Sequence, residues 1–157
     1  MVSAGQKLAL GFSVKVVSGG VAKEMAFADL LTRRTIVSVY MKNNTGTCDR
    51  QMASLVTHAE EIDCAGINLV AVSRDTGGSH VRYAAAKRVT FTLVSDPKDY
   101  FAKATDSMVE KSMYGRTFVG PARAAYFLDR DGTVLALVPK VDAENHAAQL
   151  WEMIRTL

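Results

Sequence analysis

The sequence predicts an α/β fold in which a central mixed β-sheet is flanked by helices. Three observations support this class: short β-branched segments recur along the chain, amphipathic segments separate them, and the last third holds two adjacent strand-like segments followed by a helical one. With 157 residues, of which 48% are hydrophobic and 22% charged, the chain has the size and composition of one domain covering residues 1–157. Folding a chain of this length buries roughly 70% of its unfolded surface, so the core needs no disulfide or structural metal.

The first half of the chain alternates between strands and a helix. Four segments rich in β-branched and apolar residues are predicted as buried strands: 14–17, 36–40, 67–72 and 91–94. Between the second and third of them, residues 49–64 carry apolar side chains at steps of three and four, which is the spacing of one helix face. Gly66 is expected to end that helix. The Gly19-Gly20 and Gly77-Gly78 pairs are interpreted as turns.

Two further helices are predicted in the middle of the chain. Ser79 is expected to cap a helix that runs to about Arg88. A short third helix follows Asp96-Pro97 and carries Tyr100, Phe101 and Ala104. Helices and strands therefore continue to alternate in this region.

The last third of the chain predicts a hairpin and a final helix. Residues 124–128 and 133–138 have strand character, and the short turn between them ends in Asp131-Gly132. From Asp142, the expected cap, apolar side chains at helical spacing continue to the end of the chain. The resulting order, β-α-β-α followed by a hairpin and a helix, is that of the thioredoxin architecture.

Charge, hydropathy and cysteine content exclude several classes of function. Nineteen Lys and Arg against sixteen Asp and Glu leave a net charge of +3, which is spread along the chain, so we expect no nucleic-acid partner. No uncharged apolar run approaches the ~18 residues of a membrane span, so we expect no membrane partner. The first twenty residues lack the layout of a signal peptide, so the expected location is the cytoplasm. The two cysteines are too few for a secreted disulfide framework.

We expect neither a metal nor another cofactor. The three histidines, His58, His80 and His146, lie on separate predicted helices without other ligands at metal-binding spacing. The sequence contains no Gly-rich phosphate loop and no dinucleotide-binding fingerprint. It also lacks the G-x-S-x-G elbow of the hydrolases. The remaining candidate chemistry is that of a cysteine.

Cys48 is the most informative residue of the sequence. A polar loop, Asn43 to Thr47, leaves a predicted buried strand and runs directly into the first predicted helix, which places Cys48 at a helix N-terminus. The free backbone N–H groups and the positive end of the helix dipole favour an anion there, which lowers the pKa of a thiol. Cys48 is therefore either an activated thiolate or an ordinary small residue in a first helical turn.

The sequence resembles the peroxiredoxins, in particular the bacterioferritin comigratory protein (PrxQ) branch of this AhpC/TSA-like family. Four stretches in the same order carry the resemblance: Tyr40 with Asn44-Thr45-Gly46-Thr47-Cys48 and Gln51, then Ser95-Asp96-Pro97, then Lys111 to Thr117, and Gly120 to Gly132 with Arg123 before Phe127-Leu128-Asp129. Together they span nearly the whole chain. The resemblance implies a thioredoxin-like fold and a thiol peroxidase.

The resemblance also assigns roles to individual residues. Cys48 matches the peroxidatic cysteine, whose thiolate attacks a hydroperoxide and becomes a sulfenic acid. Thr45 matches the threonine whose hydroxyl orients the peroxide, and its alternative role is that of a capping or turn hydroxyl. Arg123 matches the arginine that holds the thiolate and stabilises charge on the oxygens, against the alternative of a solvated charge at a strand end. Gln51 is expected to orient Arg123, and Tyr40 is expected beside the substrate pocket.

The chain departs from the family pattern at three places. Met41 stands where the family has a proline seven residues before the cysteine, so the pocket loses the rigidity that a proline ring gives it. Gly46-Thr47 replaces a common Pro-Gly pair. Ala53 stands where many members of the branch have a resolving cysteine. Cys64 is then the only other thiol, and we expect it to be a buried packing residue and no resolving partner.

The lack of an internal partner predicts a one-cysteine cycle. An external thiol, either thioredoxin, glutaredoxin or glutathione, would reduce the sulfenic acid on Cys48 in two steps. An intermolecular disulfide, or reduction through Cys64 after a large rearrangement, stays open. The substrates would be hydrogen peroxide and organic hydroperoxides, and the expected state is a monomer or a weak homodimer. Two rival interpretations keep the fold: a redox-sensing or binding protein with little turnover, and a redox-inert domain.

Overall fold

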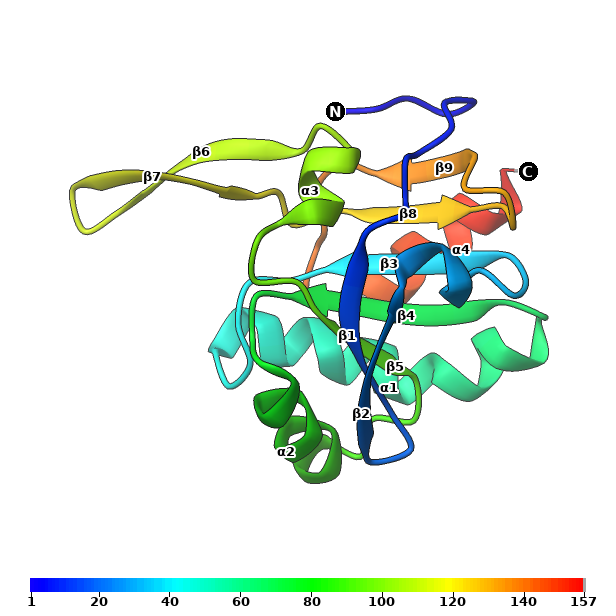
Figure 1. Ribbon diagram of the computed structural model, residues 1–157, viewed down its shortest axis with the longest axis horizontal. Helices are drawn as coiled ribbons and strands as arrows, with labels where there is room; N and C mark the ends of the chain where they lie inside the picture. The colour runs from blue at the N-terminus through cyan, green and yellow to red at the C-terminus, as the bar shows by residue number, and fades with distance from the viewer. Residues whose placement is uncertain (157) are drawn as a thin grey trace.

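The computed structural model describes residues 1–156, which fold around a seven-stranded mixed sheet (Figure 1). The strand order is β2-β1-β5-β4-β3-β8-β9, in which β3, β4 and β5 run parallel and the other pairs antiparallel. The strands are β1 (Ser13–Ser18), β2 (Val21–Ala26), β3 (Thr35–Val39), β4 (Asn68–Ser73), β5 (Thr92–Ser95), β8 (Ala125–Leu128) and β9 (Val134–Val138). The predicted central mixed sheet is confirmed.

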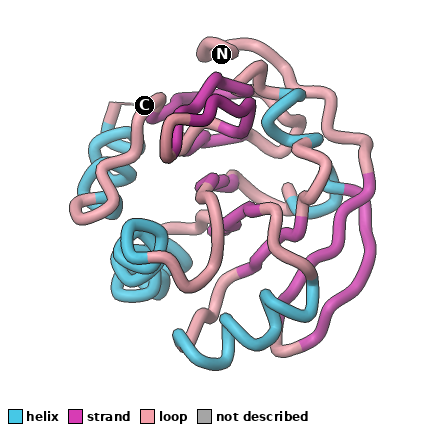
Figure 2. The backbone as a smooth tube through the Cα atoms, turned by 90° about the vertical axis from the view of Figure 1, so that its left-hand side faces the viewer, coloured by secondary structure: helices cyan, strands magenta, loops and turns pink. Residues whose placement is uncertain are grey.

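Helices cover both faces of this sheet (Figure 2). The long helix α1 (Gly46–Cys64) packs on one face together with α2 (Gly77–Lys87) and α4 (His146–Arg155). The opposite face is covered by the 3-10 helix η1 (Phe27–Leu30), the short α3 (Tyr100–Ala104) and the N-terminal segment. The sheet is thus the middle layer of three, and each face buries its own hydrophobic cluster.

The central strand β3 is buried on both of its faces. Ile36 packs in the cluster under α1, whereas Val37 and Val39 pack in the cluster on the opposite face. Because side chains alternate along a strand, Ser38 shares the face of Ile36 and lies beneath α1. The strand therefore brings one buried hydroxyl to the side of the sheet that carries the helices α1 and α4.

The structure corrects two predicted helix starts. Helix α2 begins at Gly77, and its N-cap is Thr76, whose hydroxyl accepts a hydrogen bond from the backbone N–H of Ser79 at 3.1 Å. Gly77 and Gly78 are consequently helical and not a turn. Helix α4 begins at His146, four residues after Asp142, because the Asp142 carboxylate stabilises a preceding turn by accepting hydrogen bonds from Glu144 N and Asn145 Nδ2.

Three strands were not predicted, and most of their described residues are exposed or half-buried. Strand β2 is an edge strand, and β6 (Met108–Met113) pairs with β7 (Arg116–Pro121) in a separate antiparallel arm that projects from the body in Figure 1. Side chains that face water on both sides need no alternation of apolar and polar residues, so the pattern that marks a strand is weak there. The arm turns at Tyr114-Gly115, both at positive φ, as a two-residue hairpin loop requires.

Within residues 1–156, no helix is both long and apolar enough to cross a membrane.

We expect the substitution Tyr126→Phe to stabilise the fold by about 1 kcal/mol. Among the residues that the structure describes, the Tyr126 hydroxyl is the buried side-chain oxygen without a hydrogen-bond partner. Removing an unsatisfied hydroxyl abolishes its desolvation cost and leaves the ring packed against Phe101. Urea unfolding of the parent and the variant measures the difference.

The matched control is Tyr83→Phe. The Tyr83 hydroxyl donates a hydrogen bond to Asp49 Oδ1 at 2.7 Å, so the same chemical change should destabilise the protein there. A lower free energy of unfolding for Tyr126→Phe would show that its hydroxyl has a partner.

Candidate active site

Cys48 lies in the first turn of α1, with Thr45 as the N-cap in an extended conformation. The loop that precedes it leaves the carboxyl end of β3, the strand at the centre of the sheet. The Cys48 side chain is almost fully buried, with 1% of its surface exposed. The predicted position of Cys48 at a helix N-terminus is confirmed, and the free N–H groups of that turn favour a negative charge on the sulfur.

Arg123 reaches Cys48 from 75 positions further along the chain. Its Nη1 donates hydrogen bonds to Cys48 Sγ at 3.2 Å and to Gln51 Oε1 at 2.7 Å. Arg123 lies two positions before the start of β8, which pairs antiparallel with β3, so the sheet brings it beside the loop that follows β3. Its backbone is also held, because Val141 N donates to Arg123 O at 3.0 Å. The sequence resemblance indicated this proximity, whereas no local pattern did.

The pKa of the Cys48 thiol is lower than that of an ordinary thiol. Burial alone would raise this pKa, because it removes water from the charged form. Hydrogen bonds from the Thr45 side chain, the backbone of Lys42, Arg123 and the backbone of Met41 stabilise the thiolate and outweigh the cost of burial. The reacting form of the cysteine is therefore favoured by its surroundings.

The Thr45 hydroxyl is engaged within the loop and does not cap α1 among the described hydrogen bonds. Thr45 Oγ1 donates to Lys42 O at 2.9 Å, and the hydroxyl also lies within reach of the Cys48 sulfur. The single hydroxyl proton alternates between Lys42 O and the Cys48 thiolate, and the two lone pairs of the oxygen stay free to accept from a donor such as a hydroperoxide.

The substitution Thr45→Val is expected to raise the pKa of the Cys48 thiol and to slow its oxidation by hydrogen peroxide roughly tenfold, because the thiolate loses a hydrogen-bond donor. Absorbance of the thiolate as a function of pH and the rate of oxidation measure the two effects. Thr45→Ser keeps the hydroxyl and should behave like the parent. Equal rates for the valine and serine variants would remove Thr45 from the site.

Tyr40 lies behind the loop and fully inside the protein. Its hydroxyl donates to Asn43 Oδ1 at 2.5 Å and lies 3.4 Å from His80 Nδ1. Asn43 Nδ2 in turn donates to Ser79 Oγ at 3.1 Å, which ties the loop to α2. Burial raises the pKa of the Tyr40 phenol, so it remains protonated and a hydrogen-bond donor. The structure thus places Tyr40 as an anchor of the loop that carries Thr45.

Met41 lines a cavity of about 400 Å³ beside the loop. The other lining residues come from the loop, from the segment after β4 and from the projecting arm: Lys42, Arg74, Asp75, Lys111, Phe118 and Pro121. Lys111 Nζ contacts the Met41 thioether sulfur. Burial, together with the positive charges of Arg123 and Arg74, lowers the pKa of Lys111. The wall of this cavity therefore combines apolar surface with positive charge.

The sequence did not reveal which residues fix the loop and the first turn of α1 to α2 and to β3. Asn43 and Asp49 looked like ordinary loop and first-turn residues, yet both bond to α2, Asn43 through Ser79 and Asp49 through Tyr83. Ser38 was counted as part of a buried strand, although a hydroxyl in a fully buried strand is itself a signal that it has a partner. That partner is Gln51, whose Nε2 donates to Ser38 Oγ at 2.8 Å.

Cys64 is exposed, which corrects the expectation of a buried packing residue. It is the last residue of α1, and at the helix terminus its side chain faces solvent and not the sheet. Helix α1 is continuous between the two cysteines, so 16 positions at about 1.5 Å each separate them by roughly 24 Å along its axis. A disulfide needs Cα atoms within about 7 Å, so an internal bridge would require most of α1 to unwind.

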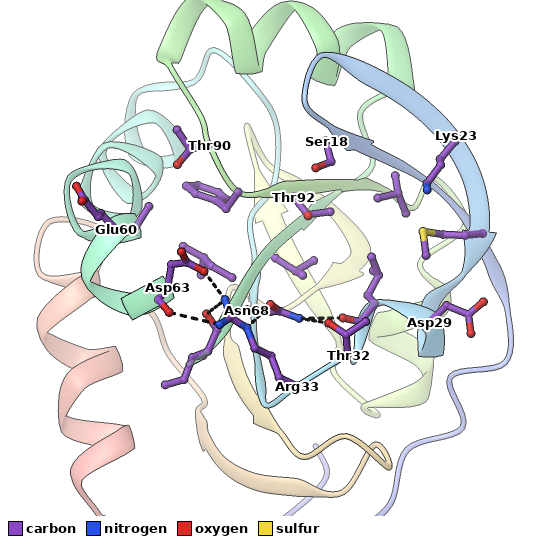
Figure 3. Close-up of a pocket in the computed structure, with 18 residues that line it drawn as sticks. Ser18, Lys23, Asp29, Thr32, Arg33, Glu60, Asp63, Asn68, Thr90 and Thr92 are labelled. Carbon is purple, nitrogen blue, oxygen red and sulfur yellow. Dashed lines mark hydrogen bonds and ion pairs between the residues drawn. The ribbon is translucent and has the colours of Figure 1, made fainter. Parts of the chain in front are cut away.

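A larger cavity, of about 660 Å³, lies near the same end of α1 as Cys64 (Figure 3). Its lining includes apolar strand residues such as Val16 and Leu69, and Arg33 on its rim bonds to Asn68 and Asp63. Asp63 on this rim is 15 positions from Cys48 along α1, so the cavity lies at the opposite end of the helix from the reactive thiol. None of the predicted site residues lines it.

The fold is a mixed sheet flanked by helices, and an arginine holds a cysteine at the N-terminus of one of these helices. This combination places the chain among the peroxiredoxins, which are thiol peroxidases. Comparison with known proteins gives the family. The model of the AhpC/TSA family matches residues 6–137, and the chain belongs to this family.

Individual relatives agree with this assignment. Peroxiredoxin Bcp of Xanthomonas campestris is 32% identical over 112 residues, which are 71% of this chain and 70% of that protein. Peroxiredoxin Bcp of Escherichia coli is 27% identical over 124 residues, 79% of this chain and 80% of its own. A solved structure of the Xanthomonas campestris bacterioferritin comigratory protein superposes with a TM-score of 0.85 at 25% identity, covering 98% of both chains. The predicted thioredoxin-like fold and the resemblance to the bacterioferritin comigratory proteins are confirmed.

Proposed function

We propose that the protein reduces hydroperoxides at Cys48. The thiolate attacks the terminal oxygen of the peroxide, a sulfur–oxygen bond forms as the oxygen–oxygen bond breaks, and the leaving alkoxide or hydroxide takes up a proton. Cys48 is thereby oxidised to the sulfenic acid, while the peroxide is reduced to an alcohol or to water. The single observation that carries this proposal is the contact of 3.2 Å between Arg123 Nη1 and Cys48 Sγ.

Two neighbours of Cys48 serve this step. Arg123 stabilises the thiolate before the reaction and the negative charge on the oxygens during it, since a guanidinium donates several hydrogen bonds from one fixed plane. Thr45 orients the peroxide through its hydroxyl, which lies beside the sulfur. Gln51 accepts a hydrogen bond from Arg123 at 2.7 Å and so fixes the direction of the guanidinium.

The substrates that we propose are hydrogen peroxide and organic hydroperoxides. The cavity of about 400 Å³ beside Met41 offers room for an organic group next to the loop that carries Thr45. The related Xanthomonas campestris protein has alkyl peroxide reduction activity. Both points support an active site that accepts more than hydrogen peroxide.

The catalytic cycle that we propose uses one cysteine and an external thiol. The thiol attacks the sulfenic acid, releases water and forms a mixed disulfide, and a second thiol then regenerates Cys48 and leaves as a disulfide. Thioredoxin, glutaredoxin or glutathione would supply these thiols. The separation of roughly 24 Å between Cys48 and Cys64 along α1 supports this cycle over an internal disulfide.

Peroxide oxidation of the parent, Cys48→Ser and Cys64→Ser, followed by mass spectrometry of the intact protein, tests this proposal. We expect the parent and Cys64→Ser to react several powers of ten faster than a free thiol, and each to gain one oxygen atom that a dithiol removes. Cys48→Ser should not consume peroxide catalytically. Equal turnover by Cys48→Ser would refute the proposal, and slow oxidation without turnover would favour a redox sensor.

A further inference from the structure

A series of buried hydrogen bonds lies on the side of Gln51 that faces away from Arg123. A chain of buried hydrogen bonds continues from Gln51 through Ser38 on β3 to His146, the first residue of α4. Ser38 and His146 are both fully buried, and the Ser38 Oγ to His146 Nε2 distance is 2.8 Å. The described hydrogen bonds join neither residue to Cys48, and the catalytic step described above uses neither.

We propose that His146 is a positioning residue for Arg123, which it holds in place through Ser38 and Gln51. This inference rests on the proposed roles of Cys48 and Arg123 and adds the element that orients them. It assigns to α4 a part in the reactivity of a thiol to which none of its described hydrogen bonds runs.

The direction of every hydrogen bond in this chain is fixed from its two ends. At one end the Arg123 guanidinium only donates, so the Gln51 atom that faces it is the carbonyl oxygen Oε1. Gln51 Nε2 therefore points the other way, toward Ser38 Oγ and toward Val39 O, which only accepts, at 3.2 Å. Ser38 Oγ accepts from Gln51, which leaves its own proton for His146.

At the other end, backbone groups orient the Gln149 side chain. Its Oε1 accepts from Asp142 N at 2.8 Å, and its Nε2 donates to Lys140 O at 3.1 Å. His146 Nδ1 lies 3.4 Å from this same Oε1 and must carry a proton to bond to it. His146 Nε2 then has a free lone pair that accepts the Ser38 proton.

The hydrogen-bond directions deduced from Arg123 and from Gln149 are the same, and no donor faces a donor and no acceptor an acceptor. Arg123 donates to Gln51, Gln51 to Ser38, Ser38 to His146 and His146 to Gln149, all in one direction. The arrangement requires a neutral imidazole, and burial, which lowers the pKa of His146 to about 4, keeps it neutral. Buried groups satisfied in this way lose hydrogen bonds if they rotate, so the chain restricts Gln51, and through it Arg123, to one orientation.

Substitutions at His146 and Ser38 test this inference, with the pKa of the Cys48 thiol and its rate of oxidation as readouts. Removing the acceptor with His146→Phe is expected to raise the thiol pKa and to slow the oxidation roughly three- to tenfold. His146→Gln keeps an acceptor for Ser38 and should recover most of the loss. His58→Phe makes the same change at a half-buried position of α1, where the imidazole bonds to Ser54 O at 3.0 Å and to no member of this chain of hydrogen bonds, and it should match the parent in both readouts.

A double substitution separates positioning from general loss of stability. If His146 acts through Ser38, the double variant should have nearly the same thiol pKa and oxidation rate as Ser38→Ala alone. Each substitution is nevertheless expected to lower the melting temperature. Thiol pKa and rate values that equal those of the parent in folded His146→Phe would overturn the inference. Purely additive effects in the double variant would overturn it as well. A parent thiol that reacts no faster than a free thiol would instead refute the proposed peroxidase function. The inference about His146 would still be tested in that case, because the thiol pKa reports on the Arg123 contact whatever the rate.

Discussion

The variant Arg123→Met is expected to react with hydrogen peroxide about 100- to 1,000-fold more slowly than the parent. The guanidinium is the charged donor on the Cys48 sulfur, and removal of one such donor from a preorganised site costs about two to three orders of magnitude in rate. The thiol pKa should rise at the same time, since burial then acts with less opposition. Competition kinetics against a peroxidase of known rate measure the loss at a pH above both thiol pKa values.

Arg123→Lys is the informative control for this prediction. Lysine keeps the positive charge, but it cannot donate from one fixed plane to Cys48 Sγ and Gln51 Oε1 together. We expect its rate to lie between those of the parent and Arg123→Met. A methionine variant that keeps the parent's rate would mean that the arginine has only a structural role.

Acid is expected to destabilise the protein between about pH 6.5 and pH 4 because of a buried histidine. Burial lowers the pKa of His146 to about 4, whereas the unfolded chain binds a proton near pH 6.5. As the pH falls through this window, the unfolded state takes up a proton that the folded state does not. The free energy of unfolding should therefore decrease, by about 3 kcal/mol from this group alone. Below pH 4 both states are protonated and this contribution is lost completely.

Urea unfolding of the parent and of His146→Gln across this pH range measures the effect. The glutamine variant lacks the titrating imidazole, so its stability should fall less as the pH decreases. His80, whose pKa is also lowered by burial, contributes in the same direction in both proteins. Burial raises the pKa of Asp96 and opposes this trend equally in both. Identical pH dependence in the two proteins would contradict the prediction.

The sequence predicted the buried strands and helices and did not predict the exposed strands. β3 was predicted because a strand buried on both faces is a short run of β-branched residues, and α1 was predicted because a helix that buries one face has apolar residues at steps of three and four. β2 and the β6–β7 arm bury little, so their residues follow no such pattern. The turns are their local signals: the predicted turn at Gly19-Gly20 joins β1 to β2, and Tyr114-Gly115 joins β6 to β7. Helix starts failed for a different reason: Thr76 and Ser79, or Asn145 and Asp142, are equally good caps in sequence, and the chain geometry selects one.

The candidate site was predictable only in part for a similar reason. Cys48 and Thr45 are local features of one loop and one helix start, so their neighbourhood follows from the sequence around them. The contact of Arg123 with Cys48 depends on the pairing of β8 with β3, and the link from Gln51 to His146 depends on where α4 packs. Such contacts join residues far apart in the chain, and periodicity carries no information about them. Family resemblance supplied the arginine, whereas only the structure supplied the histidine.

The separation of 75 positions between Cys48 and Arg123 has a consequence for the newly made chain. A ribosome adds about 5 to 20 residues per second, so Cys48 is synthesised roughly 4 to 15 seconds before its arginine. Strand β8 must then emerge and pair with β3 before the guanidinium can reach the sulfur. During this interval the thiol lacks the partner that activates it. The growing polypeptide therefore carries a cysteine without the guanidinium contact, and the thiol gains its full set of hydrogen bonds only when β8 pairs with β3.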